Sequence, residues 1–232
     1  MPPITLRQNI PAWSVAAAVA LVVVAMWAGY RAIGLPPVII VGGSGVVALV
    51  LWLWTFRHGP IETAIILPPF LLTVAFLETH MIEEYVTGFG PAMSRLFDIS
   101  WTERGFLLVF AFIGPIIYSL TALGLYWRIP LAGFVAWFIF VGPGVAEFTH
   151  FIFPLIKPAI LPDDPQQITQ MVSNGILVEN MPNYFIGTTG QYYFSGLYTA
   201  VLPMVPGIYG IYAVVRESRR RERATAFSIK QT

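Results

Sequence analysis

The sequence contains no cysteine, which excludes a disulfide framework, a thiolate metal site and a cysteine nucleophile. Charged residues are scarce as well: they make up 11% of the 232 residues, whereas soluble domains carry roughly 25%. A soluble chain could not cover its surface with so few charges. The sequence also lacks a phosphate-binding loop and a dinucleotide fingerprint, so nothing in it indicates a nucleotide-dependent enzyme.

What the sequence does contain is long apolar runs, and 56% of its residues are hydrophobic. Each run is close to the ~20 residues that a helix needs to cross the hydrocarbon core of a bilayer. The runs predict an all-α fold, a polytopic transmembrane helix bundle with about six spans in a single domain, residues 1–232. The expected spans are Ala12–Leu35, Pro37–Phe56, Glu62–Tyr85, Glu103–Trp127, Pro130–Ile156 and Tyr192–Val215.

The charges outside the spans predict the orientation in the membrane. The tail, residues 216–232, is rich in arginine, and basic segments of this kind stay in the cytoplasm. With an even number of spans, both termini are then cytoplasmic and the long loop 157–191 faces outward. We expect a short helix in that loop, near Gln166–Val172.

Two histidine–carboxylate motifs lie inside the predicted spans. Their residues are Glu78, His80, Glu83 and Glu84 in the third span and Glu147 and His150 in the fifth. At ~100° per residue, His80, Glu83 and Glu84 share one sector of their helix, whereas Glu78 lies on the opposite side. Glu147 and His150 share a face. His80 lies ~27 Å and His150 ~30 Å along their spans, so both motifs reach a similar depth near the outer face.

Ionisable groups in hydrocarbon cost at least a few kcal/mol each, so these side chains are expected to face a cavity and to find partners there. Imidazoles and carboxylates at this spacing are what a divalent metal prefers. The predicted metal ligands, or residues directly behind the ligands, are His80, Glu83, Glu84, Glu147 and His150, with Glu84 and Glu147 as catalytic groups. One or two ions of iron or zinc are expected, and one ion with three ligands and a water is equally open.

Simpler interpretations stay open for several of these residues. Glu83 and Glu84 could be carboxylates at headgroup level, and the two histidines could be ordinary interior side chains. We expect Glu78 to pair with Arg95 or Arg104 rather than to bind a metal. Aromatic residues near the outer face are expected to form an interfacial belt, and glycines in the spans to serve close packing. The belt residues are Tyr85, Trp101, Tyr192 and Tyr193, and the glycines are Gly142, Gly144, Gly187, Gly190 and Gly196.

The run His80-Met-Ile-Glu83-Glu84 resembles the defining motif of the HXXEE-domain family of bacterial membrane proteins. That family has a second histidine in a later span, as His150 is here, and a Tyr-x-Pro-Gly-Leu-x-Thr stretch that opens its last span. The segment Tyr193–Thr199 is similar, with Ser195 in the proline position. The family's Asn-x-x-x-His motif differs here, because Ala146 replaces the asparagine. The resemblance covers Leu67–Tyr209 and implies a membrane enzyme of the bacterial inner membrane.

A fainter resemblance is to the sterol-isomerase and sigma-2-receptor (EXPERA) superfamily. Its isomerases carry His-x-x-x-Glu in a span, as His80 and Glu84 do, and Pro130–Pro154 and Val205–Gly207 are also similar. The fourth span, however, has no acidic residue after Glu103 where those isomerases use one. The resemblance implies a metal-free isomerase that moves protons.

These observations lead to an expected function. We expect a metal-dependent integral membrane enzyme that acts on a lipophilic substrate in a cavity between the third, fifth and sixth spans. The alternatives are a metal-free acid–base isomerase of a sterol- or isoprenoid-like lipid, and a lipid-binding receptor or small transporter. The expected partners are a lipophilic small molecule and the lipid bilayer, without nucleic acid, and a homodimer is left open.

Overall fold

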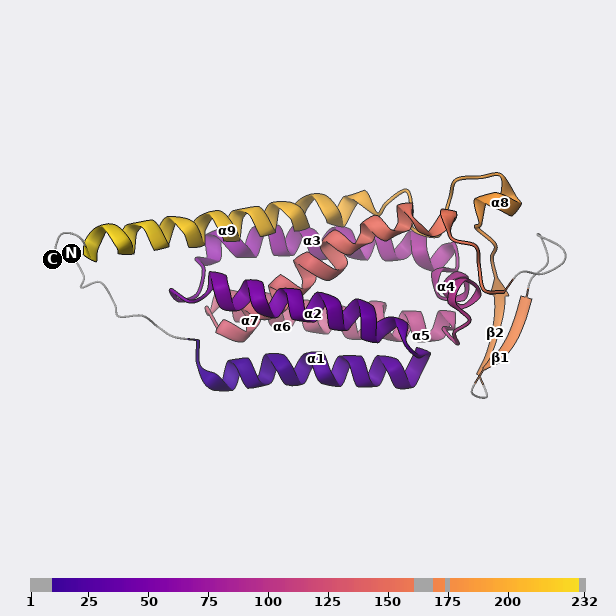
Figure 1. The fold of residues 1–232 in the computed structure, drawn as a ribbon, viewed down its shortest axis with the longest axis horizontal. Helices are drawn as coiled ribbons and strands as arrows, with labels where there is room; N and C mark the ends of the chain where they lie inside the picture. Colours follow the sequence, from indigo (N-terminus) through magenta and orange to yellow (C-terminus); the bar gives the residue numbers. More distant parts are fainter. Residues whose placement is uncertain (1–9, 161–168, 174–175, 230–232) are drawn as a thin grey trace.

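The structure, a computed structural model, describes residues 10–160, 169–173 and 176–229. Five helical segments in it are long and apolar enough to cross a membrane (Figure 1). They are Ala12–Ile33, Pro36–Thr55, Thr63–Val86, Glu103–Tyr126 and Pro130–Leu155. These segments overlap the first five spans expected from the sequence, and they identify the chain as an integral membrane protein.

The first two spans form a hairpin. α1 (Ala12–Ile33) turns into α2 (Pro36–Thr55) at Gly34, whose φ of 89° is readily adopted only by glycine. Gly45 of α2 lies against Val22 of α1, where an added Cβ would come within 2.7 Å of the valine side chain. The missing side chain therefore allows the two helices to approach closely, as is common between membrane helices.

α3 (Thr63–Val86) is the central helix of the bundle, and α9 (Val201–Ile229) runs alongside it (Figure 1). The expected sixth span, Tyr192–Val215, is only partly helical: residues 195–200 form a turn, and α9 begins at Val201. Its apolar part, 201–215, covers roughly 22 Å, which is less than the ~30 Å of a bilayer core. α9 is therefore not among the five clear spans, although it ends at the same end of the bundle at which α1 begins.

The fourth and fifth spans depart from regular α-helix near their middle. α5 (Glu103–Leu107) continues through the π-helix η1 (Leu108–Ile113) into α6 (Gly114–Tyr126). α7 (Pro130–Ile139) continues through the π-helix η2 (Phe140–Val145) into two 3₁₀ segments, η3 (Ala146–Phe151) and η4 (Phe153–Leu155). Pro143 lies inside η2 and has no N–H to donate, which accounts for the change of helix type in this span.

The remaining elements cover the end of the bundle at which α3 ends. This end is called the hairpin end below, after the β1–β2 hairpin that lies there. They are α4 (Phe89–Phe97), α8 (Ile186–Thr189) and the antiparallel strands β1 (Thr169–Ser173) and β2 (Ile176–Met181) (Figure 1). The helix expected at Gln166–Val172 is wrong where it can be checked, because residues 169–172 belong to β1. Residues 166–168 lie outside the described part of the chain. The cross-strand hydrogen bonds of the hairpin replace those of a helix.

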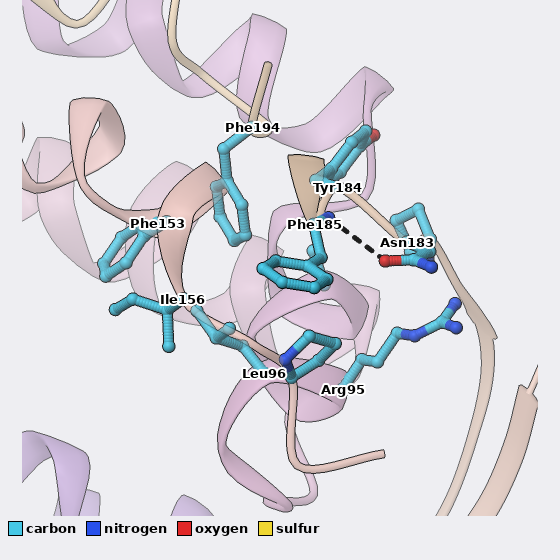
Figure 2. Close-up of a pocket in the computed structure, with 11 residues that line it drawn as sticks. Arg95, Leu96, Phe153, Ile156, Asn183, Tyr184, Phe185 and Phe194 are labelled. Carbon is cyan, nitrogen blue, oxygen red and sulfur yellow. Dashed lines mark hydrogen bonds between the residues drawn. The ribbon is translucent and has the colours of Figure 1, made fainter. Parts of the chain in front are cut away.

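Arg95 ties α4 to the loop that follows the fifth span. Its side chain is 2% exposed, and it donates to the carbonyl oxygens of Ile160 and Met181. Burial lowers the pKa of this guanidinium, although an arginine stays charged. Among the described residues no ion pair joins Glu78 to Arg95 or to Arg104, and Glu78 Oε1 is buried without a hydrogen bond, so the expected pairing is wrong. The pocket beside Arg95 (Figure 2) has a volume of about 10 Å³, room for about one water molecule and too little for a substrate.

At the opposite end of the bundle, the arginine-rich part of α9 is docked on the loop before α3. Glu217 is 5% exposed and accepts hydrogen bonds from Arg220 and Arg221, and Arg221 also donates to the carbonyl oxygen of Pro60. The hydrogen bond from Arg220 lowers the pKa of the Glu217 carboxyl below its ordinary value, and the bond from Arg221 adds to this effect. The basic tail is thus a fixed part of the fold as far as Arg221.

Candidate metal centre

Four side chains from two spans meet at the hairpin end. They are His80 and Glu84 of α3 and Glu147 and His150 of η3, and one ligand atom from each lies within 4.8 Å of all the others. The imidazole rings of His80 and His150 are 4.8 Å apart. The predicted convergence of the two histidine motifs is therefore confirmed.

Local helix geometry aims each pair at the same point. His80 and Glu84 are four residues apart in an α-helix, so their side chains lie one above the other. Glu147 and His150 are three residues apart in a 3₁₀-helix, where side chains at this spacing eclipse. The change of helix type after Pro143 thus places both groups on the side that faces α3.

The separations within this cluster match those of ligands around one ion. Glu147 Oε2 lies 3.2 Å from His80 Nε2 and 2.9 Å from His150 Nε2. Glu84 Oε1 lies 3.5 Å and 3.2 Å from the same two nitrogens. Four ligands at about 2.0–2.1 Å from a tetrahedral ion are about 3.3–3.4 Å from one another. These four separations are close to that value, whereas the ligand atoms of the whole cluster extend over up to 4.8 Å, so one tetrahedral ion would be held after small side-chain shifts.

Hydrogen bonds on the far side of each imidazole set its tautomer. His150 Nδ1 lies 2.7 Å from the carbonyl oxygen of Ser195, which can only accept, so Nδ1 carries the proton. His80 Nδ1 lies 2.9 Å from Thr199 Oγ1, and that hydroxyl donates in turn to Glu83 Oε2 at 2.6 Å. Nδ1 of His80 therefore donates as well. Both Nε2 atoms face the centre, which is the usual arrangement for histidines that bind metals.

One nitrogen of the cluster makes no hydrogen bond, although two carboxylate oxygens lie 3.2 and 3.5 Å from it. Nε2 of His80 is buried without a hydrogen bond, and such groups are rare and costly in proteins. A metal ion would use its lone pair. A divalent ion would also be neutralised by the carboxylates of Glu84 and Glu147, so that the centre would carry no net charge in a medium of low dielectric constant. The residues present therefore fit a divalent metal.

The turn before α9 closes over this cluster. Gly196 has φ of 85°, and a Cβ on it would come within 2.7 Å of His80, 2.8 Å of His150 and 2.8 Å of Glu84. Only glycine fits both the conformation and the space. Ser195 Oγ also donates to the backbone carbonyl of Glu84, which fixes the turn to the end of α3.

Glu83 lies outside the four-residue cluster. Its carboxylate accepts hydrogen bonds from the backbone N–H groups of Tyr198 and Thr199 and from the hydroxyl of Tyr193. Tyr193, which we expected in the interfacial belt, is thus a partner of Glu83. Through Thr199, Glu83 supports the orientation of His80 instead of facing the centre itself.

The surroundings of the cluster are aromatic and largely closed to water. The rings of Phe89, Phe153 and Phe194 lie 5.3, 5.8 and 6.4 Å from that of His150. Glu84 is 2% exposed, which contradicts a wetted carboxylate at headgroup level. Glu147 has the most exposed side chain of the four, at 13%, so it marks the side from which a small group can reach the centre.

Sequence reasoning missed the residues behind the ligands. Ser195 and Thr199 carry no metal-binding signature of their own, and Gly196 was assigned to helix packing. The signal that could have found them is the ordered Gly-Leu-x-Thr stretch just before α9, since a glycine and a hydroxyl at fixed spacing suit a tight turn with a polar contact. No known protein family, curated protein or solved structure matches the sequence.

Proposed function

We propose that the protein is a metal-dependent membrane enzyme in which His80, Glu84, Glu147 and His150 bind one divalent ion, iron or zinc. The observation that carries this proposal is the orientation of the two histidines: both Nδ1 atoms are used as donors, and both Nε2 atoms face two carboxylate oxygens. The four histidine–carboxylate separations of 2.9–3.5 Å suit ligands of one ion, and small side-chain shifts would bring the wider pairs of the cluster, up to 4.8 Å apart, into range.

The roles of the residues follow from their exposure. A bound ion of this kind supplies Lewis-acid chemistry and lowers the pKa of a bound water. Glu147 directs Oε2 at both imidazoles, and its 13% side-chain exposure suits this carboxylate to take up or release a proton. Glu84 is enclosed and holds its place between the two histidines. Glu83, Thr199 and Ser195 orient the imidazoles.

The substrate in this proposal is lipophilic. The cluster lies near the end of two membrane spans and is surrounded by phenylalanine rings, which offer no partner to a strongly polar substrate. The proposal includes α9 as a sixth crossing, which is supported by its return to the end at which α1 begins. Both termini are then cytoplasmic, the cluster lies toward the outer face of a bacterial inner membrane, and the HXXEE resemblance is the family relationship that we propose.

One contact favours a second candidate, a metal-free isomerase that moves a proton along a lipid. Glu147 Oε2 and His150 Nε2 are 2.9 Å apart, which is an ordinary hydrogen-bond distance if the nitrogen is protonated. Two protonated imidazoles and two carboxylates would also be neutral together. This candidate leaves His80 Nε2 without a well-aligned acceptor, and we therefore favour the metal.

Elemental analysis of the purified protein separates the two candidates. After expression in metal-replete medium, the wild type should contain about one equivalent of iron or zinc. His80→Ala and His150→Ala should lose most of it while the protein stays folded, because interhelical packing and not a single ligand holds the bundle together. A metal-free wild type with unchanged His→Ala variants would refute the proposal and favour the isomerase.

A further inference from the structure

A groove opens beside the cluster, between the α1–α2 turn and the segment that follows α4. One wall, called the 33–40 wall below, is formed by residues 33–36, 39 and 40, and the other by residues 97–100. Thr149 and Phe153 of the fifth span line the groove as well. Its volume is about 590 Å³, within the range of roughly 300–1,000 Å³ that is typical of small-molecule sites.

The groove is continuous with the membrane-facing surface. Leu35, Ile39 and Ile40 are 58%, 64% and 48% exposed, and they lie at the start of α2, a membrane span. Ile39 and Ile40 are only about 5–6 Å along α2 from its first residue, so the groove lies just inside the membrane at the hairpin end. The medium at its open side is therefore lipid acyl chains.

The groove is also in contact with the cluster. The ring of Phe153 lines the groove on one side and lies 5.8 Å from the ring of His150 on the other. Thr149, the residue before His150, lines it too. A chain bound there would be one side chain away from the candidate metal centre.

The charge of the lining restricts the ligand. Asp98 is the only charged residue among the described residues that line the groove, and the other polar groups are the hydroxyls of Ser100 and Thr149. A carboxylate or phosphate headgroup would find no cation to pair with and one carboxylate to repel it. Hydroxyls and a carboxylate can instead accept or exchange hydrogen bonds with an alcohol.

We propose that this groove binds the hydrocarbon chain of an uncharged, single-chain lipid with an alcohol-type polar end, and that it is the substrate channel of the centre. The second half of this statement rests on the proposed function, whereas lipid binding in the groove does not. The chain lies against the 33–40 wall, and its polar end is near Asp98, Ser100 and Thr149.

The experiment uses a long-chain alcohol that carries a photoreactive diazirine, incorporated with the full-length protein into neutral lipid vesicles. Adducts are mapped by mass spectrometry. We expect them to concentrate on peptides that contain residues 33–40 and 97–100. Ile40→Trp should abolish most of this labelling, because the larger indole ring fills the space that the chain would occupy.

The matched control is Val46→Trp, which adds the same ring to the same helix at a position that is 60% exposed and outside the groove. If labelling is spread evenly over α1 and α2, or falls equally in both variants, the proposal is wrong. The labelling would then reflect only ordinary contact with the surrounding lipid.

The ligand class is tested with a fatty-acid probe of equal length in alkaline buffer, where the acid is ionised even though the bilayer raises its pKa. The wild type should be labelled less by the acid than by the alcohol, and Asp98→Asn should narrow that difference. Asparagine suits the φ of 55° at this position. Equal labelling by both probes would overturn the ligand class.

The alcohol labelling is also measured with metal-free protein, because lipid binding in the groove does not depend on the metal. If the protein proves not to bind metal but the groove is still labelled, the proposed function is refuted and lipid binding in the groove stands.

Discussion

His80 donates a hydrogen bond of 2.9 Å from Nδ1 to the hydroxyl of Thr199, a residue that is 119 positions away in the sequence. The same hydroxyl donates to Glu83, one turn along from His80 on the same helix. The imidazole of His80 is therefore oriented by a contact that forms only when the turn before α9 is in place.

This contact predicts the effect of Thr199→Val. The valine has nearly the same shape but cannot accept from His80, and loss of such a partner typically weakens metal binding 10–100-fold. We expect that range in a chelator competition assay, and recovery with Thr199→Ser, which restores the hydroxyl. Equal affinities in the wild type and both variants would show that Thr199 has no role in positioning His80.

Gly196→Ala should damage the cluster as a whole. The new methyl group would overlap both imidazoles and Glu84, and its φ of 85° is unfavourable for alanine. Overpacking of this kind costs about 1–3 kcal/mol, so we expect Tm to fall by roughly 5 °C and metal binding to be lost. Gly43→Ala is the control, because no atom lies within 4 Å of its added Cβ. A variant of Gly196 that binds metal like the wild type would contradict the packed arrangement of the turn.

Metal removal should lower thermal stability without unfolding the bundle. A ligand that binds only the folded state stabilises it by an amount that grows with its concentration, about 2.7 kcal/mol at one hundred times Kd. Tm of the chelated wild type should therefore rise on titration with zinc or iron. His150→Ala should show no such rise. An equal response of that variant would place metal binding elsewhere on the protein.

The docked part of α9 should become less stable in acid. The folded pKa of Glu217 is lowered, so its contribution to stability is present above the ordinary pKa of glutamate and is lost as the pH falls through the lowered value. Melting curves of the wild type and Glu217→Gln should differ at neutral pH and converge in acid. Glu222→Gln, at an exposed pair with Arg57, is the control and should have little effect at any pH. Parallel curves for Glu217→Gln and the wild type would refute this account.

The sequence was sufficient to predict the five clear spans, because a run of about 20 apolar residues has few other stable uses. It also predicted the meeting of His80 with His150, since both lie at similar depth on helices that must bury their ionisable groups. The 3₁₀ segment that holds His150 was not predicted, because the effect of Pro143 on helix type depends on how the neighbouring helices satisfy the backbone. The turn at residues 195–200 was not predicted either. These residues directly precede an apolar run, and their composition does not separate the start of a helix from a turn before it.

The β hairpin and the role of Glu83 needed the structure as well. Thr169–Ser173 pairs with Ile176–Met181, and pairing between two such short strands leaves little trace in composition. Glu83 shares a helix sector with His80 and Glu84, yet it faces a different partner. A helix sector of about 100° is too wide to distinguish Glu84, which faces the candidate metal centre, from Glu83 beside it, which does not.

The position of Gly196 in the chain has a consequence for biogenesis. All four residues of the cluster precede residue 151, but both Nδ1 acceptors, Ser195 and Thr199, follow it by more than forty positions. A nascent chain that has inserted its first five spans carries every candidate ligand and neither of the groups that orient the imidazoles. The cluster is therefore completed last, when the turn before α9 forms, and under the proposed function a half-made protein would bind metal less tightly than the finished one.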